Sequence, residues 1–587
     1  MYDVVIKNGK IVDGTGKASF KGDIGIKDGL IAKVANTDQG NAITDNATEI
    51  IDAAGAIVSP GWVDTHSHMD GQATWDPYCS PANHHGITTL VMGNCGIGFA
   101  PCKPNALAQK QLIQVVEDVE DIPETALIEG ITWDWESFPE YLDALDKMPR
   151  AVNIAAQVPH CAIRTYVMGD RGANNERATP EDVEKMAALV AEGIEAGGVG
   201  FTTSRTELHK TRNGQSMPGT YSEQDELFGI GKKLGELGKG FYGMVSDWDD
   251  DAWREEMEWM KRISIENKCR FNFVLFYQTN EQWQRVKDQL AFVAQANEEG
   301  AQLVAHVGAR PVSVLMSYHG SVHPFRLHKN FEPLLELSPE ERIKKLRDPA
   351  VKAAILAEPT PKIGRDFPDR MVSEFDLMFE LGDDPDYEQG PDQTIAAKAK
   401  AAGVTPQEYA YDAMLALDGQ AVLYFPLAGY DERNLDRQFE LLDDDNSVIS
   451  LADTGAHCGV LADASMPTFL ISHYVRDRKG SKFSIEQAVK MHSHDTARAV
   501  CLEDRGTLEV GMRADINVID FDNLRLQSPE IIYDLPAGGR RMFQGAKGYR
   551  YTLVSGEVIM KDGVETQAMP GSLIRGAQPA PQDVASW

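Results

Sequence analysis

Nearly continuous apolar runs alternate with helix-like segments through the middle of the chain, and this alternation is the strongest pattern in the sequence. Consecutive apolar positions of this kind are typical of strands buried on both faces of a parallel sheet. We expect strands within residues 61–68, 87–95, 151–160, 197–205, 240–247, 270–278, 301–310 and 447–455. Eight such strands with intervening helices favour an α/β fold, the (β/α)8 TIM barrel, over an open sheet.

Residues 179–197 show the helical pattern most clearly. Thr179 is expected to cap this helix and Pro180 to lie in its first turn. The apolar positions fall on one face of the helix and are Val183, Met186, Leu189, Val190 and Ile194. A second helix is expected to begin at Ser222, with Asp225 completing a variant of the capping box.

The two ends of the chain resemble each other. Residues 2–16 and 551–565 are short β-like runs broken by Asn-Gly, Ser-Gly or Asp-Gly pairs, which are hairpin signals. The simplest interpretation is one small β-sandwich domain built from both termini. The predicted boundaries are 1–58 and 505–570 for this domain, 59–504 for the barrel, around 312–446 for a large insertion with extra helices over the barrel mouth, and 571–587 for a C-terminal tail.

Length and charge narrow the class of protein. The 587 residues are too many for one small core, so a large domain and a smaller one are expected. Asp and Glu outnumber Lys and Arg by 89 to 57, and the net charge of −32 argues against nucleic acid or an anionic membrane as a partner. We find no signal-peptide pattern and no membrane-spanning apolar run. Seven scattered cysteines do not form a disulfide framework, so a cytoplasmic protein is expected.

Side chains that can bind a metal follow the apolar runs, where a barrel places its chemistry. His66 and His68 end the first run two residues apart, so both imidazoles face the same side of a strand. Cys95 ends the second run among glycines that allow a tight turn, and Asp453 ends the eighth. Imidazole, thiolate and carboxylate are zinc ligands, so these four residues are the predicted metal centre.

Each of these residues also has an ordinary structural explanation. The histidines could be a surface pair, Cys95 a small buried hydrophobe, and Asp453 the cap of a turn. In the catalytic interpretation, Asp453 binds the metal and takes a proton from metal-bound water, while the metal supplies hydroxide and polarises a carbonyl. That double role suits metal-assisted hydrolysis.

Four further residues at strand ends are candidates for binding the substrate or the metal. His160 and His306 would hydrogen-bond the substrate or complete the metal shell, or would be satisfied core histidines. Arg205 and Arg310 would hold a substrate carboxylate in a bidentate pair, or would form salt bridges in this acidic chain.

Several motifs spread over nearly the whole chain point to a known family: DVVIKNGKIVDGTG, PGWVDTHSHMD, GITTLVMGNCGIGFAP, VPHCAIRTYVMG, LADTGAHCG and RGTLEVGMRADINVID. On these motifs the chain resembles the D-aminoacylase (N-acyl-D-amino-acid deacylase) family of the amidohydrolase superfamily, as a divergent branch. The resemblance implies a metal-dependent hydrolase barrel, one or two zinc ions, and hydrolysis of an N-acyl amide. It assigns His66, His68, Cys95 and Asp453 to the metal, and it makes Asp453 the base that later protonates the leaving amine.

Two departures from the family pattern bear on the number of metals. Many amidohydrolases bridge two metals with a carboxylated lysine on the fourth strand, but GGVGFTTSR contains no lysine, which is consistent with Cys95 in the bridging role. D-aminoacylases place a histidine on each of the fifth and sixth strands, but GFYGMVSD and RFNFVLFYQ contain none. Either one metal is held by the four residues named above, or His306 and His160 substitute from other strands.

Three functions are consistent with these observations. The first is a zinc-dependent hydrolase that cleaves the amide bond of an N-acyl amino acid or a similar small molecule. The second is hydrolysis of a lactone, a cyclic amide or an ester on the same fold. The third is a barrel that only binds a ligand, which the intact set of His66, His68 and Asp453 speaks against. Homo-oligomerisation is left open.

Overall fold

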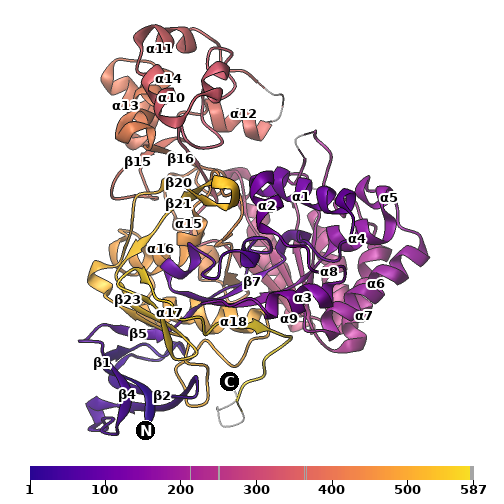
Figure 1. The fold of residues 1–587 in the computed structure, drawn as a ribbon, viewed down its shortest axis with the longest axis vertical. Coiled ribbons are helices and arrows are strands. Elements are labelled where there is room, and N and C mark those ends of the chain that lie inside the picture. Colours follow the sequence, from indigo (N-terminus) through magenta and orange to yellow (C-terminus); the bar gives the residue numbers. More distant parts are fainter. Residues whose placement is uncertain (212, 249–251, 363, 365, 582–587) are drawn as a thin grey trace.

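The structure is a computed structural model and describes residues 1–211, 213–248, 252–362, 364 and 366–581 (Figure 1). A body of parallel strands and helices lies in the middle. A sheet that contains the N-terminus lies below it in this view, and a lobe formed by an insertion lies above it.

A strand lies within each of the eight apolar runs predicted from the sequence. The strands are β6 (Trp62–Asp64), β7 (Ile87–Met92), β8 (Asn153–Ala156) with its continuation β9 (Val158–Pro159), β10 (Gly200–Ser204), β11 (Phe241–Val245), β12 (Phe271–Val274), β13 (Leu303–Val307) and β17 (Ser447–Ile449). Neighbours pair in parallel in the orders β6–β7–β8 and β9–β10–β11–β12–β13–β17. Their side chains are almost all buried, as expected for strands covered on both faces.

The first and last of these strands also meet. Just past β6 and β17, Ser67 and Thr454 form a parallel bridge. The His68 amide donates to the Thr454 carbonyl at 2.8 Å, and the Asp453 amide donates to the His66 carbonyl at 3.0 Å. The pairings therefore run from β6 round to β17 and return to β6, so the carboxyl ends of the strands gather on one side of the molecule.

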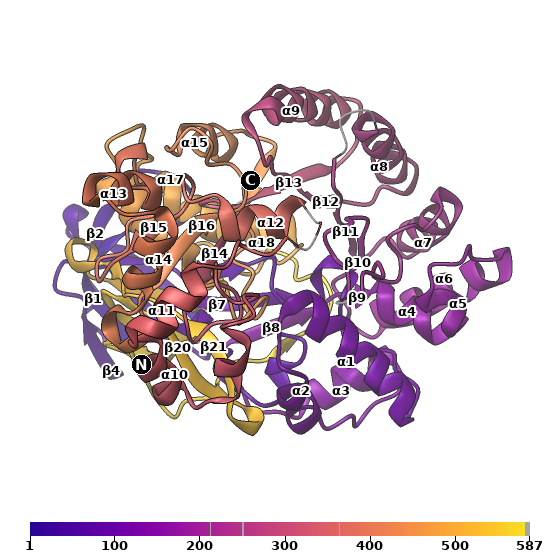
Figure 2. The same ribbon diagram turned by 90° about the horizontal axis from the view of Figure 1, so that it is seen from above.

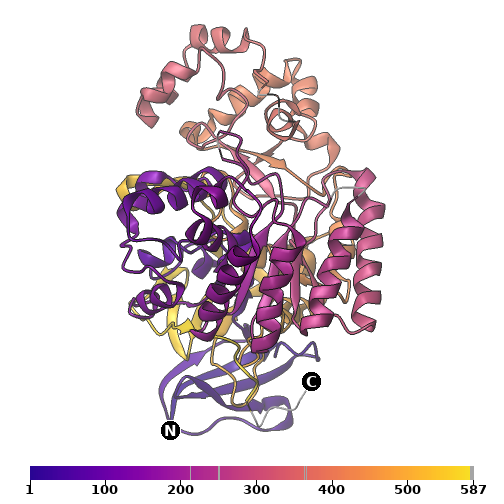
Figure 3. The same ribbon diagram turned by 90° about the vertical axis from the view of Figure 1, so that its right-hand side faces the viewer.

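Most of the helices that connect these strands lie on their outer side, as α7, α8 and α9 do beside β10–β13 in Figure 2 and in the turned view of Figure 3. Those between β6 and β13 are η2 (Gln72–Thr74), η3 (Ala82–His85), η4 (Asn94–Gly96), α1 (Ala106–Glu120), α2 (Glu124–Gly130), α3 (Phe138–Asp146), α4 (His160–Met168), α5 (Asp170–Ala173), α6 (Pro180–Glu195), α7 (Gln224–Leu237), α8 (Trp253–Asn267), η5 (Asn280–Gln282) and α9 (Trp283–Glu298). Those after β17 are η9 (Asp463–Ser465), α16 (Met466–Phe469), η10 (Leu470–Asp477), α17 (Ile485–Lys490), η11 (Met491–Asp495) and α18 (Thr496–Ala499).

The two predicted helix starts have different outcomes. Helix α6 begins as predicted, because the Thr179 hydroxyl accepts from the Asp182 amide and the Asp182 carboxylate accepts from the Thr179 amide. The prediction of Ser222 as the cap of α7 is wrong, since this helix begins at Gln224. The Ser222 hydroxyl instead donates to the buried Glu226 carboxylate at 3.0 Å, and a hydrogen bond to a charged acceptor is stronger than the neutral bond of a helix cap.

Both ends of the chain contribute to one nine-stranded sheet. Its strands are β1 (Tyr2–Ile11), β2 (Phe20–Lys27), β3 (Leu30–Asn36), β4 (Ala47–Asp52) and β5 (Ile57–Pro60) from the N-terminal part, and β18 (Ile516–Ile519), β23 (Tyr549–Val554), β24 (Glu557–Lys561) and β25 (Val564–Glu565) from the C-terminal part. The two parts join where β5 pairs antiparallel with β18. An apolar core that includes Ile24, Val58 and Leu553 packs against this sheet.

Most of the segment between β13 and β17 forms the upper lobe of Figure 1, whereas its last helix, α15 (Asp436–Leu442), lies below the lobe and contacts β17. The elements of the lobe are β14 (Ser313–Met316), η6 (Glu332–Glu336), α10 (Pro339–Leu346), α11 (Pro349–Leu356), α12 (Asp366–Ser373), β15 (Phe379–Leu381), η7 (Pro391–Gln393), α13 (Ile395–Ala402), α14 (Pro406–Met414), η8 (Ala416–Gly419) and β16 (Val422–Pro426). An apolar core of its own surrounds Tyr318, Phe331 and Tyr411. The base of the lobe reaches the carboxyl ends of the parallel strands.

The last described residues return to the parallel strands. β26 (Leu573–Ile574) pairs in parallel with the edge of β8, so this part of the expected C-terminal tail is a strand, and residues 582–587 lie outside the described residues. The remaining elements are η1 (Thr37–Gln39), η12 (Phe521–Asn523), β19 (Arg525–Leu526), β20 (Glu530–Leu535), η13 (Pro536–Gly538), β21 (Gly539–Phe543) and β22 (Ala546–Lys547). Among the described residues, we find no helix with the length and apolar character needed to cross a bilayer.

Candidate metal centre

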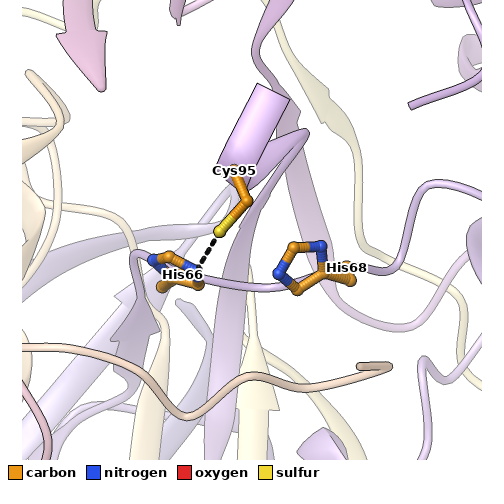
Figure 4. A group of neighbouring side chains, drawn as sticks. All are labelled: His66, His68 and Cys95. Atoms are coloured by element: carbon orange, nitrogen blue, oxygen red, sulfur yellow. Dashed lines mark hydrogen bonds between the residues drawn. The ribbon is translucent and has the colours of Figure 1, made fainter. Parts of the chain in front are cut away.

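Three side chains that can bind a metal meet at the carboxyl ends of β6 and β7 (Figure 4). His66 and His68 follow β6, and Cys95 reaches toward them from η4. One ligand atom from each residue lies within 4.8 Å of the others. The Cys95 Sγ is 3.3 Å from His66 Nε2, and the two imidazole centres are 5.5 Å apart. All three residues are buried. The structure therefore brings together three of the residues that the sequence singled out.

Asp453 joins this group from the loop that follows β17. Its Oδ1 lies 3.5 Å from His66 Nε2 and 3.4 Å from His68 Nε2. This oxygen is buried and has no hydrogen-bond partner in the part of the chain that the structure describes. Burial acts to raise the pKa of Asp453, but the nearby imidazoles of His68 and His66 lower that pKa well below its usual value. An ionised carboxylate oxygen, two imidazole nitrogens and a thiol thus share one small space.

Unusual backbone turns aim Cys95 and Asp453 at this space. Cys95 has φ 55° and Asp453 has φ 49°, both in the left-handed region that non-glycine residues rarely adopt. Gly93, with φ 85°, permits the turn into η4, since a Cβ there would lie 2.6 Å from the Gln157 carbonyl oxygen. Backbone strain of this kind is common at functional sites, where the surrounding structure holds the strained residue in place.

Buried polar side chains hold the loops of the group. Asp64 accepts from the His66 amide and from the Thr454 hydroxyl, each at 3.0 Å, and so links the first and last strand ends. Asn94, beside the cysteine, donates to the Thr65 carbonyl at 3.2 Å. These bonds connect three strand ends, so the positions of the ligands depend on one another.

The donor set fits a tetrahedral zinc ion. Zinc binds nitrogen, oxygen and thiolate sulfur at about 2.0–2.3 Å, which places neighbouring ligand atoms about 3.4 Å apart. The measured separations from His66 Nε2 are 3.3 Å to Cys95 Sγ and 3.5 Å to Asp453 Oδ1. Burial raises the pKa of the Cys95 thiol to about 11, so a nearby cation would be needed to hold it as a thiolate. A cation would also provide the partner that Asp453 Oδ1 lacks among the described protein atoms.

Glu120, the last residue of α1, is a buried carboxylate beside this group that sequence reasoning missed. Its side chain is 1% exposed, its Oε1 lies 3.4 Å from His68 Nδ1, and its Oε2 lies 3.8 Å from His457 Nε2. Although burial lowers the pKa of His68, Glu120 and Asp453 raise it well above its usual value. A carboxylate behind a metal-binding imidazole fixes the ring and increases its basicity. We assign Glu120 as a residue that orients His68.

Glu120→Gln is expected to lower zinc affinity by about 10- to 100-fold, because the neutral amide neither orients His68 nor supports its basicity as a carboxylate does. Competition with a chromophoric chelator measures this change. Glu117→Gln, one helical turn earlier on α1, is the matched control and should bind zinc as the wild type does. Unchanged zinc affinity in Glu120→Gln would contradict the assignment.

The metal-binding group lines a cavity of about 270 Å³. Its wall is mainly apolar and includes Val119, Leu208, Val245, Val274, Leu275, Phe276, Tyr277, Pro311, Val312, Leu427, Ala428 and Leu451. These residues come from α1, from the carboxyl ends of the parallel strands and the loops after them, and from the base of the insertion lobe. A concave, mostly apolar space with a few polar groups is typical of a small-molecule site.

His209 and His457 also line this cavity, and sequence reasoning assigned them no role. His209 lies in the long loop after β10, and its Nδ1 is 3.0 Å from the Ser204 hydroxyl. His457 follows Asp453 by four residues, and its side chain is 34% exposed. Both residues lie in loops that follow strand ends, and this position was the signal in the sequence for a functional role. A loop position alone does not show that a side chain turns toward the cavity.

The carboxyl ends of β11 and β12 bring no histidine to the cavity within the described ranges. They contribute Val245, Val274 and the segment 275–278. The departure from the family pattern noted in the sequence therefore has a structural counterpart, since apolar and neutral side chains occupy these two positions around the cavity.

His306 and His160 lie outside the cavity. His306, on β13, bonds through Nδ1 to the Ser450 hydroxyl at 2.9 Å and borders a separate void of about 20 Å³ together with His66 and Cys95. His160, at the start of α4, bonds through Nδ1 to the Thr203 hydroxyl and through Nε2 to Glu226, both at 2.8 Å. The structure therefore does not place either histidine where it would complete the shell around the metal-binding group.

Glu226 is the centre of a buried ion pair behind the strands. Arg164 Nη1 donates to its Oε1 at 2.6 Å, and His160 Nε2 bonds to the same oxygen. Burial acts to raise the pKa of Glu226, but its hydrogen bonds with His160 and Arg164 lower that pKa to about 2. The three side chains are about 1% exposed. In this environment His160 is a core histidine with both ring nitrogens hydrogen-bonded, which was the structural interpretation considered from the sequence.

Glu226→Gln is expected to lower the free energy of unfolding by about 3–5 kcal/mol at pH 7, because it leaves Arg164 buried without a counter-charge. A carboxylate with a depressed pKa stabilises the fold above its unfolded pKa of about 4.3 and loses this effect as the pH falls toward 2. The difference in Tm from the wild type should therefore shrink below about pH 4. Glu223→Gln, at an exposed position just before the same helix, is the control, and an equal loss there would show that the effect is not specific.

The two arginine candidates are already paired. Arg205 lies outside the cavity lining and binds Glu256 of α8 at 2.8 Å. Arg310 contributes to the cavity lining, but its guanidinium is fully buried, 3.1 Å from Asp463 and stacked 4.1 Å from the Tyr387 ring centre. In this arrangement neither guanidinium is presented to a substrate carboxylate.

The chain matches the model of the amidohydrolase family over residues 49–560. It is 26% identical over 558 residues to an uncharacterized protein of Mycobacterium tuberculosis, covering 89% of this chain and 85% of that protein. It is 32% identical over 203 residues to the D-aminoacylase of Alcaligenes xylosoxydans xylosoxydans, covering 34% of this chain and 37% of that enzyme.

Two solved structures are similar over nearly the whole chain. A D-aminoacylase with a binuclear metal centre matches with a TM-score of 0.64 and 21% identity, covering 98% of this chain and 100% of that one. The N-acyl-D-glutamate deacylase of Bordetella bronchiseptica, complexed with zinc and a phosphonate inhibitor, matches with a TM-score of 0.63 and 22% identity, covering 98% and 99%. At these identities the similarity shows a shared fold.

Proposed function

The chain belongs to the amidohydrolase family, and from this premise we propose that it is a zinc-dependent hydrolase that cleaves the C–N bond of an N-acyl amino acid or a similar small amide. One observation carries the proposal. His66, His68, Cys95 and Asp453, which come from three strand ends far apart in the sequence, point into one mainly apolar cavity with separations that suit a zinc ion. A protein that only binds a ligand would not need these four metal-binding side chains.

Each residue has a distinct role in the proposed reaction. When bound, zinc supplies a hydroxide nucleophile and polarises the substrate carbonyl. His66, His68 and Cys95 would hold the ion, and Glu120 would keep His68 in place. Asp453 accepts the proton that water gives up as its oxygen adds to the carbonyl carbon. The same carboxyl group then returns that proton to the amine nitrogen as the C–N bond breaks.

We propose one zinc ion, not two. Among the described residues, one group of metal-binding side chains meets the distance requirement, and it is made of His66, His68 and Cys95. The substitutes considered for a second site, His306 and His160, bond to Ser450 and to Glu226 outside the cavity. One-metal activation is described for a D-aminoacylase of the same fold, which supports a single ion as sufficient.

The proposal includes the domain organisation predicted from the sequence. The closed series of parallel pairings from β6 to β17 supports a (β/α)8 barrel within residues 59–504. The nine-stranded sheet supports a β-sandwich domain made of residues 1–58 and 505–570. The insertion around 312–446 would form one side of the substrate entrance, since its base contributes Val312 and Leu427 to the cavity.

The proposed function is tested by parallel assays of the zinc-loaded protein. The substrates are N-acyl-D-amino acids, their L-enantiomers, neutral N-acyl amines and lactones of similar size. We expect released amine from at least one amide class, loss of that activity with a chelator, and recovery with added zinc. Lactone hydrolysis without amide hydrolysis would assign the site to ester bonds, and a protein that purifies without metal and ignores added zinc would contradict the proposal.

A further inference from the structure

His209 is a polar side chain of the cavity wall that the proposed reaction does not yet use. It lies in the loop between β10 and α7 and shares the cavity with His66, His68 and Asp453. We propose that His209 Nε2 donates a hydrogen bond to the carbonyl oxygen of the scissile amide and stabilises the negative charge that develops there. This inference rests on the proposed function, since it assumes an amide carbonyl in the cavity.

The partner of His209 decides which ring nitrogen carries the proton. The Ser204 hydroxyl is buried, and its one hydrogen-bond partner among the described residues is His209 Nδ1 at 3.0 Å. If Nδ1 donated this bond, the hydroxyl proton of Ser204 would be buried without an acceptor, which is unfavourable. If the hydroxyl donates, both groups are satisfied. The second arrangement leaves the proton on Nε2, so the free nitrogen of the ring is a donor.

The surroundings keep this donor neutral and fixed. Burial lowers the pKa of His209 to about 3, and the charges of nearby His457 and His68 act in the same direction. A neutral imidazole can donate a hydrogen bond without adding a positive charge beside the zinc ligands. Both histidines are half-buried, but the bond to Ser204 at the end of a buried strand holds the His209 ring in place, whereas His457 lies 3.8 Å from Glu120. We therefore assign the role to His209 and not to His457.

A preorganised donor at this place has a clear use. Hydrogen-bond donors aimed at the oxygen of an acyl-transfer transition state contribute to kcat, because the bond is stronger to the developing oxyanion than to the ground-state carbonyl. His209 transfers no proton in this role. It would donate to the same oxygen that a bound zinc ion would polarise, at a site whose β11 and β12 ends offer no histidine in the described residues.

The test compares His209→Ala, His209→Gln and Ser204→Ala in zinc-loaded enzyme, with an amide that the wild type hydrolyses. For His209→Ala we expect kcat to fall about 100-fold or more, with KM and zinc content close to wild type. His209→Gln should recover part of the loss, since its amide nitrogen can donate from nearly the same position. Ser204→Ala should show a smaller loss than His209→Ala. The affinity of a phosphonate analogue of the tetrahedral intermediate should fall in step with kcat/KM.

Glu207→Gln is the control for disturbance of the loop. Glu207 is an exposed neighbour that bonds to Lys210 and Tyr221 and does not line the cavity, so its activity should stay near wild type. Loss of zinc in His209→Ala would make His209 a ligand and overturn the donor role. Wild-type kcat in His209→Ala would also overturn it, while leaving the proposed function standing. A zinc-loaded wild type that hydrolyses no amide would remove the proposed function and this inference with it.

Discussion

Asp453→Asn is expected to lower kcat by about 10³- to 10⁴-fold while most of the zinc stays bound. The amide keeps an oxygen near His66 and His68, so the ion retains His66, His68 and Cys95 and a neutral fourth donor. It cannot accept the proton of the attacking water, nor return one to the leaving amine. The measurements are kcat with saturating zinc and the zinc content by elemental analysis.

The control for this change is Asp463→Asn, which alters a second buried carboxylate ten residues along the chain. Asp463 pairs with Arg310 at 3.1 Å and does not line the cavity. It should lower Tm but leave kcat within about threefold of wild type, because an unpaired buried arginine destabilises the fold without touching the reacting atoms. Near-normal turnover in Asp453→Asn would end the role of Asp453 as the general base.

Cys95→Ala is expected to have the second largest effect and to act through the metal. The change removes one of the three clustered ligands and leaves the two imidazoles and Asp453. Zinc affinity should fall by more than the about 10- to 100-fold that loss of a supporting residue costs. Activity should then be low at limiting zinc and recover in part at high zinc. Titration of zinc against both activity and a competing chelator measures the change.

The matched control is Cys102→Ala in the same segment after β7. Cys102 is also buried, but its thiol bonds to the Lys103 carbonyl and it does not line the cavity. Its zinc affinity should equal that of the wild type. If Cys95→Ala binds zinc with wild-type affinity, the thiol is not a ligand. Cys95 is then the small buried hydrophobe that the sequence offered as the alternative interpretation.

The sequence predicted the site as far as strand ends can predict it. His66, His68, Cys95 and Asp453 could be grouped because each follows an apolar run, and parallel strands that pair side by side bring their carboxyl ends together. The eight runs were visible because strands buried on both faces need apolar residues at consecutive positions. These patterns are local, so they can be recognised in short segments of the sequence.

Most of the errors and omissions concern contacts between distant segments, whereas the error at Ser222 concerns a contact four residues along the chain. Ser222 has the residue type of a helix cap, but its hydroxyl donates to Glu226. His160 and Arg205 follow strand ends like the ligands, but each finds a carboxylate on a neighbouring helix. Glu120 is one of several acidic residues near the end of a helix, and nothing in its local sequence distinguishes it from its half-buried acidic neighbours.

The sequence by itself determined the alternation of strands and helices, the join of the two chain ends and the candidate metal-binding side chains, because apolar periodicity, turn residues and ligand chemistry are properties of short segments. Only the tertiary structure decided that Glu120 stands behind His68, that His209 and His457 face the cavity, and that Arg310 is held by Asp463. The physical reason is that a polar side chain near a strand end can turn inward or outward. Which way it turns depends on the partner that burial leaves available, and that partner comes from another part of the chain.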